Sequence, residues 1–169
     1  MAQRREDMTK GQAERLMPML ADMLAEADMS YSDLDRIAVG IGPGNFTGVR
    51  ISVSAARGLA LGLGIPAIGV STLEAQSFRT DTPHVSVLAA PRDQIYWQAG
   101  GAAQFGTRDD LPTGLPVLGD GGTLAPAIPR AEAMARIAAT RTPDLPPAPL
   151  YLRAADAAPP RDPAPVIIP

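Results

Sequence analysis

Residues 38–63 read AVGIGPGNFTGVRISVSAARGLALGL, and this stretch decides the fold. An apolar run leads into the loop Gly42-Pro43-Gly44, and a long segment rich in small residues follows. Glycine reaches backbone angles closed to other residues and proline cannot donate to a β-ladder, so the loop ends the run before it. Thr47 is expected to cap a helix, because its hydroxyl can accept from the first free amides. We therefore predict a buried strand at 37–41, a tight turn and a helix at 47–63. Such a turn is also a candidate anion site.

The residues after this stretch extend it into a parallel α/β unit. Gly64 is expected to end the helix, and 65–70 is expected to form the next strand. Strand, helix and strand in this order imply a parallel pair with a right-handed crossover. Ser71 and Glu74 then have the spacing of a capping box, which predicts a short helix ending near Phe78.

The predicted helix at 47–63 has two apolar flanks of different character. One flank carries larger side chains and the neighbouring flank carries small ones, so the helix can lie on a sheet while another helix approaches closely. Arg50 and Arg57 share a third face, which is expected to be solvated. The first flank consists of Val49, Val53, Ala56, Ala60 and Leu63, and the second of Gly48, Ser52, Ala55, Leu59 and Gly62.

An earlier helix is expected at 13–27, and its apolar stripe is unusually wide. Thr9 and Gln12 have capping-box spacing before it. At 100° per residue the apolar residues fill an arc of about 160°, against about 100° for an ordinary surface helix. Pro18 lies inside the helix and is expected to kink it. Two interpretations are open: the stripe is core, or part of it is a partner surface, for which adaptable methionine side chains are suited.

The second half of the chain carries weaker signals. A short turn is expected between Asp28 and Asp35, and His84 is expected to be an ordinary strand-edge residue. From Pro143 onward proline and alanine dominate, so most of that tail is expected to lack regular structure. The remaining expected elements are hairpin strands at 84–90 and 94–100 around Pro91-Arg92-Asp93, a strand at 116–118, a turn at 119–122 and a helix at 130–141.

Composition excludes several classes of function. The 169 residues are 46% hydrophobic and 20% charged, with a net charge of −3 and Lys10 as the single lysine, so no basic nucleic-acid footprint exists. No cysteine is present, which excludes disulfides and thiolate metal sites. His84 alone cannot supply a site that needs several histidines. We find no secretory signal and no run of about 18 apolar residues, so the chain is expected in the cytoplasm.

The glycine loop does not match the standard nucleotide motifs. It lacks the Lys-Ser/Thr pair of a Walker motif and the three-glycine spacing of a dinucleotide fold. Carboxylates are scattered along the chain. A protease is disfavoured, because the sequence offers no plausible nucleophile–base pair.

Three motifs resemble the TsaB (YeaZ) family, whose members belong to the complex that makes threonylcarbamoyladenosine in tRNA. The first is the glycine loop with the start of its helix, Gly42, Pro43, Gly44, Asn45, Phe46, Thr47, Gly48, Val49 and Arg50. The second is Gly69 to Glu74, and the third is the YLR segment Pro149 to Arg153. Asn45 stands where the family usually has serine. The resemblance implies a degenerate actin-like ATPase fold of the RNase H-like (ASKHA) class, α/β with two small lobes at 1–70 and 71–169.

The resemblance implies a noncatalytic scaffold or dimerisation subunit that binds its sister of the same fold, TsaD, with TsaE as a further partner. ATP and metal would belong to those subunits, and tRNA would be met only through the complex. Thr72 and Gln76 stand where the sister has two metal-binding histidines, so no metal or catalytic residue is expected here. The implied partner interface is a bundle of the first two helices, formed by Leu16, Met17, Leu20, Met23, Leu24, Val49, Val53, Ala56, Leu59 and Ala60.

Two alternatives stay open. The chain could pair with itself as a homodimer, or it could be a nucleotide-dependent phosphotransferase or ATPase of the same fold. Family members usually begin with a strand and hairpin carrying an Asp-Thr-Ser phosphate loop, whereas this sequence starts almost directly at the first helix. Three explanations are open: the start of the sequence is misassigned, the chain is truncated, or this member has lost those strands. Without that opposing loop, Gly42 to Gly48 is interpreted as a hinge between a buried strand and an interface helix.

Overall fold

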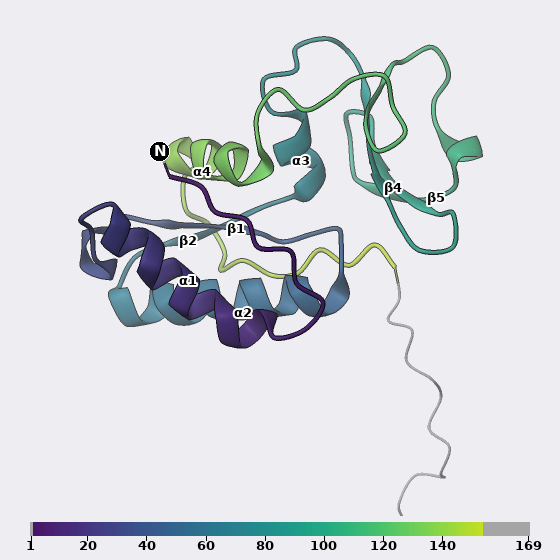
Figure 1. Ribbon diagram of the computed structural model, residues 1–169. Coiled ribbons are helices and arrows are strands. Elements are labelled where there is room, and N and C mark those ends of the chain that lie inside the picture. Colours follow the sequence, from purple (N-terminus) through teal and green to yellow (C-terminus); the bar gives the residue numbers. More distant parts are fainter. Residues whose placement is uncertain (1, 154–169) are drawn as a thin grey trace, which may run out of the picture.

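A computed structural model describes residues 2–153 (Figure 1). Two sheets, flanked by helices, make up this part of the chain. Two short 3₁₀ turns lie at Tyr31–Asp33 and Arg108–Asp110. The helices are α1 (Gln12–Glu26), α2 (Phe46–Leu63), α3 (Thr72–Ser77) and α4 (Arg130–Thr140). The strands are β1 (Ile37–Gly40), β2 (Ala67–Val70), β3 (Val85–Ala89), β4 (Ile95–Gln98), β5 (Gln104–Gly106) and β6 (Val117–Gly119).

The first sheet is the parallel pair predicted from residues 38–63. β1 and β2 run in register from Ile37 beside Ala67 to Gly40 beside Val70. α2 contacts this sheet on one side and α4 on the other (Figure 1). A strand is expected to be apolar along its whole length when helices cover both faces of its sheet, because the side chains on both faces are then shielded from water. The core under α2 contains Val39, Val53 and Ala56, and the core under α4 contains Ile68, Val70, Ala133 and Ala138.

The second sheet has the strand order β5, β4, β3, β6. β3 and β4 form the predicted hairpin, and Arg92 and Asp93 take positive φ in its turn. The strand expected at 116–118 is present as β6, and it pairs parallel to β3. β5 was not predicted. The predicted boundary at residue 70 separates the two sheets, but α4, from the second half of the chain, covers the first sheet.

Some helix ends differ from the expected ones. The capping box at Thr9 and Gln12 was wrong: Gly11, with φ +81°, precedes α1, and Gln12 Nε2 donates to Met8 O at 3.0 Å. Glycine suits that position because a Cβ disfavours the left-handed region. The predicted ends at Gly64 and Ser71 are confirmed, since Gly64 is left-handed after α2 and Ser71 Oγ accepts from Glu74 N.

The C-terminal part of the described chain returns to the first sheet. Arg36 Nη1 donates to Ala138 O at 2.8 Å near the end of α4. Arg141 Nη1 then donates to Gly69 O at 2.8 Å, and Leu150 N donates to Ile41 O at 2.7 Å. Residues 143–153 contain no helix or strand, in agreement with the prediction, and the rest of the predicted tail lies outside the described residues.

Candidate functional site

The start of the glycine loop is buried and is held by a hydrogen bond from the start of α3. Gly42 and Pro43 are buried, and the peptide bond between them is cis. Thr72 N donates to Gly42 O at 2.7 Å, which joins the loop to the start of α3. Gly42 has φ +94°, and a Cβ there would lie 3.4 Å from Leu150 O and from Val49 Cγ2. The glycine therefore lets the C-terminal segment pass close to the loop.

Asn45, and not Thr47, caps α2. Its Oδ1 accepts from Gly48 N at 2.8 Å, while Thr47 lies exposed two residues further along, inside α2. Asparagine is as good an N-cap as serine, so the departure from the family's usual serine preserves the cap. The cap occupies one of the amides that an anion at this helix end would otherwise bind. Gly44 and Gly48 are both exposed beside it.

Arg50 is exposed, as expected, and its guanidinium packs beside two aromatic rings. Its guanidinium carbon lies 4.1 Å from the Phe46 ring centroid and 5.8 Å from that of Tyr151. Arg50 Nε also donates to Tyr151 Oη at 2.8 Å, and the two rings are 4.9 Å apart. This cluster joins the start of α2 to the YLR segment, so the first and third motifs of the sequence meet in space.

The apolar stripe of α1 is only partly covered. No residue of α1 is buried, and Met17 is 38% exposed. The interpretation of the stripe as core is therefore wrong for the described chain. The half-buried members of the stripe are Leu16, Met19, Leu20, Met23 and Leu24.

The predicted interface residues of α2 divide between two faces. Val53, Ala56 and Ala60 are 3%, 5% and 8% exposed, and the first two pack with Val39 of β1. These three face the interior and offer no surface to a partner, which corrects the predicted interface. Val49 is half-buried against the same cluster. Leu59 lies on the other flank.

A groove of about 470 Å³ lies between α1 and α2. Met17 borders it from α1, and Tyr31, whose Oη donates to Met17 O at 3.4 Å, closes one end. A Cβ added at Gly58 or Gly62 would meet nothing within 4 Å. The α2 side carries Ala55, Leu59 and Gly62 of the small-residue flank, together with Gly58 and Leu63. The prediction that this flank leaves room for another helix therefore agrees with the open space observed.

Ion pairs hold the polar side of α1 to the segment that precedes it. Arg15 donates to both carboxylate oxygens of Glu6, at 2.8 and 2.6 Å, and pairs with Asp22 at 3.2 Å. Arg4 pairs with Asp22 and Glu26. The hydrogen bond from Arg15 lowers the pKa of the Glu6 carboxyl. All these charges lie on α1 and the segment before it, so the helix has a charged side and an incompletely covered apolar side.

Gln76 is part of the core and not a ligand site. It is 1% exposed, and its Nε2 lies 3.0 Å from Ser86 Oγ, 3.0 Å from Val87 O and 2.9 Å from Leu118 O. The amide therefore joins α3 to β3 and β6. Thr72, four residues earlier, uses its backbone N–H on the glycine loop. Neither residue directs a strong metal ligand into open space.

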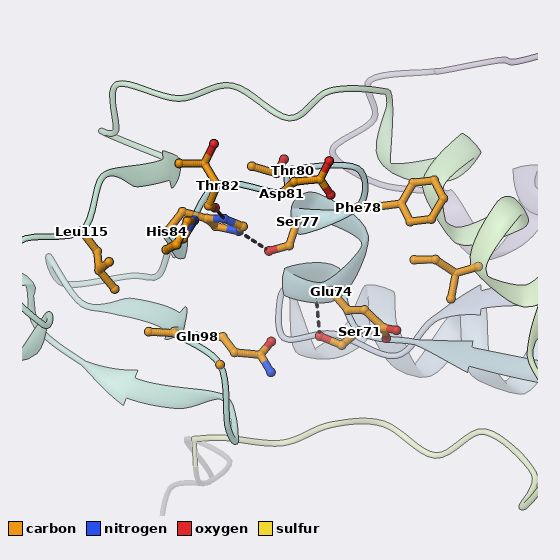
Figure 2. A pocket seen from close by; sticks show the side chains of 14 residues that line it. Ser71, Glu74, Ser77, Phe78, Thr80, Asp81, Thr82, His84, Gln98 and Leu115 are labelled. Atoms are coloured by element: carbon orange, nitrogen blue, oxygen red, sulfur yellow. Dashed lines mark hydrogen bonds between the residues drawn. The ribbon is translucent and has the colours of Figure 1, made fainter.

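A cavity of about 830 Å³ brings together two residues that the sequence did not connect (Figure 2). His84, before β3, has Nε2 2.9 Å from Ser77 Oγ at the end of α3. Its Nδ1 lies 2.7 Å from Thr82 O. We expected His84 to be an ordinary strand-edge residue and expected no nucleophile–base pair in the sequence. Neither expectation included this contact, because the contact forms where the connection between α3 and β3 folds back. No spacing rule signals it.

Neither a metal-binding group of side chains nor a membrane-spanning helix is found among the described residues. Among residues 2–153, no three His, Cys, Asp or Glu side chains are grouped so that they could hold a metal ion. Within the same range, no helix is both long and apolar enough to cross a bilayer.

Comparison with known proteins gives consistent matches. A family model described as TsaD, tRNA N6-adenosine threonylcarbamoyltransferase, matches residues 6–148. The TsaB protein of Escherichia coli, named for tRNA threonylcarbamoyladenosine biosynthesis, is 44% identical over 89 residues, covering 50% of this chain and 38% of its own length. An uncharacterised protein of Mycobacterium leprae is 37% identical over 118 residues, covering 65% of this chain and 33% of its own length.

A solved structure, YeaZ from Pseudomonas aeruginosa, matches with a TM-score of 0.67 at 24% identity and covers 87% of each chain. That match concerns the fold alone. The chain spans less than half the length of the two curated relatives above. Because the family model extends over most of the sequence, the chain belongs to the TsaD-type family with its actin-like α/β fold, and it is similar to proteins named TsaB.

Proposed function

We propose that this chain acts in threonylcarbamoyladenosine formation in tRNA as a noncatalytic scaffold that binds a TsaD-type catalytic subunit. The E. coli relative is named for that biosynthesis, and the family model is that of the transferase. ATP and metal are then bound by the partner subunits, with a TsaE-type ATPase among them. A net charge of −3 supports an indirect contact with tRNA, since phosphate binding depends on clustered basic residues. The cytoplasm, where tRNA is modified, is the proposed location.

The observation that carries the proposal is the incompletely covered apolar face of α1. Leu16, Leu20, Met23 and Leu24 are each only half-buried, and Met17 borders the open groove beside α2. Burying a leucine or methionine side chain completely is worth about 1.5 to 3 kcal/mol before ordering costs. A partner helix laid against α1 and the groove would complete that burial. The groove's small residues would let the partner backbone come close.

The double variant Leu20→Asp/Met23→Asp is expected to weaken binding to the TsaD-type protein of the same organism at least tenfold. The reason is that an interface can bury an unpaired carboxylate only at a high free-energy cost. Isothermal titration calorimetry measures the affinity. The control is Ala25→Asp, which adds one carboxylate on the opposite, exposed side of α1.

Unchanged affinity for Leu20→Asp/Met23→Asp, with folding verified by circular dichroism, would remove α1 from the interface. Light scattering of the chain without its partner tests the homodimer. A dimer that the same variant dissociates would assign this face to self-association, and a monomer that binds the TsaD-type protein supports the scaffold.

Gly58→Ala gives a test in which stability and binding change in opposite directions. Alanine in a helix interior is favoured over glycine by about 0.5 to 1 kcal/mol, and the new methyl group enters open space, so the free energy of unfolding should rise by that amount. If a partner helix packs into the groove, the same methyl should weaken binding severalfold. Urea unfolding and calorimetry measure the two effects. Stronger or equal binding would mean that the groove stays empty in the complex.

A further inference from the structure

The two hydrogen bonds of His84 determine which ring nitrogen donates and which accepts. Thr82 O can only accept a hydrogen bond, so Nδ1, 2.7 Å away, carries the proton of a neutral imidazole. Nε2 is then the acceptor, and the Ser77 hydroxyl donates to it at 2.9 Å. A serine hydroxyl bonded to an imidazole whose other nitrogen is held by a third group is the arrangement of an activated nucleophile. Here the third group is a backbone carbonyl.

Both residues are accessible from the cavity that they line. Ser77 and His84 are half-buried, and Figure 2 shows the hydroxyl and the ring facing each other across the space between α3 and the start of β3. The walls combine apolar groups, Phe78, Leu115 and Ile137, with polar groups. Asp81 and Glu74 add carboxylates, and Glu74 is paired with Arg141. An anionic substrate would be repelled by the Asp81 carboxylate, whereas a neutral or cationic one would not.

We propose that Ser77 and His84 form a nucleophile–base pair that hydrolyses small neutral or cationic esters. Ser77 Oγ bonds to the ester carbonyl carbon while its proton passes to His84 Nε2. The bond between that carbon and the alcohol oxygen breaks, and the alcohol leaves with the proton from Nε2. Water, deprotonated by the same nitrogen, then adds to the acyl carbon. The bond between that carbon and Ser77 Oγ breaks, the carboxylic acid leaves, and Nε2 returns its proton to Ser77 Oγ.

Covalent labelling is the direct test of the pair. The full chain is incubated with a neutral alkyl fluorophosphonate, in which Ser77 Oγ would displace fluoride from phosphorus, and the modified residue is mapped by mass spectrometry. We expect one label, at Ser77, and none in Ser77→Ala. His84→Gln, which keeps a polar side chain of similar size but no base, should slow labelling at least tenfold, since general-base catalysis contributes about 10² to 10⁴. Ser54→Ala, at an exposed serine of α2, is the matched control and should label like the wild type.

The pH profile separates a base from a merely structural histidine. The wild-type labelling rate should rise between about pH 5 and about pH 8, because only the neutral imidazole can accept the serine proton. In His84→Gln the rate should be low and without that rise, and in His84→Ala added imidazole should restore part of it. Hydrolysis of p-nitrophenyl acetate by the same variants reports turnover. No label at Ser77, or a labelling rate that does not depend on His84, would overturn the proposal. Neither outcome bears on the scaffold role.

Discussion

Replacing Gln76 with leucine is expected to lower the free energy of unfolding by about 3 kcal/mol. The amide nitrogen lies within hydrogen-bonding distance of Ser86 Oγ, Val87 O and Leu118 O, and it is shut off from solvent. Leucine fills a similar volume but donates nothing, so buried acceptors lose their donor. Each buried group left without a partner costs about 1 to 3 kcal/mol.

The acceptors around Gln76 do not lose equally. Val87 O also accepts from Asp120 N at 3.1 Å, and the Ser86 hydroxyl still donates to Leu73 O at 3.3 Å. The amide nitrogen has only two N–H groups, so we expect the loss of about two hydrogen bonds and not three. The destabilisation should affect β3 and β6 of the second sheet, because the amide joins α3 to these two strands.

Urea unfolding followed by the fluorescence of Trp97 in β4 measures this effect. The control is Gln104→Leu, the same chemical change at an exposed position of β5, which should alter stability by less than about 0.5 kcal/mol. A loss below about 1 kcal/mol for Gln76→Leu would mean that the leucine site relaxes or admits water, and that the amide is not an essential tie.

The parts of the fold that were predicted correctly depend on short-range signals. Residues 38–63 predicted β1, the turn and α2, because an apolar run, a glycine-proline loop and a helical pattern follow one another within one stretch. Gly64 and Ser71 mark helix ends through their own backbone or side-chain chemistry. The hairpin around Arg92 and Asp93 is likewise a local turn. Such signals need no knowledge of distant residues.

The errors at helix starts are also local, but they arise from competition between neighbours. Asn45 and Thr47 can both cap, and Thr9 and Gln12 have a plausible spacing. What decides is the backbone: Asn45 is extended, with φ −60° and ψ 121°, and Gly11 is left-handed. A sequence gives several candidate caps within two residues of each other, and the chain uses the one whose backbone fits the incoming loop.

The contacts that make up the candidate sites were missed because they join distant segments. Arg50 donates a hydrogen bond to Tyr151, which lies far from it in the sequence. The prediction considered only the neighbours of Arg50 on its own helix and so did not include this contact. α4 covers the first sheet although it follows the second. Ser77 and His84 meet through an irregular connection that has no periodic pattern. Conversely, the wide apolar stripe of α1 was recognised in the sequence. Only the structure shows that the rest of the described chain leaves its side chains partly exposed to solvent.

The substitution Gly119→Ala should cost about 3 kcal/mol or more. Gly119 has φ +99°, a conformation that residues with a Cβ rarely adopt. An added methyl group would overlap Gln76 Nε2 and lie 2.6 Å from Val87 O. The carbonyl belongs to a sheet strand and cannot move away without breaking the pairing of β3 with β6. Backbone strain and overlap therefore add in the same direction.

A double-mutant cycle with Gln76→Ala identifies which contact makes Gly119 necessary. Gln76→Ala removes the amide that the new methyl would strike, so the double variant should be less destabilised than the sum of the single variants, by about 1 kcal/mol. The φ strain and the approach to Val87 O persist, so the cost of Gly119→Ala does not vanish. Gly58→Ala, in open space on α2, is the control for the substitution itself. Additive losses would mean that backbone strain and the Val87 carbonyl, and not the buried amide, exclude a side chain at residue 119.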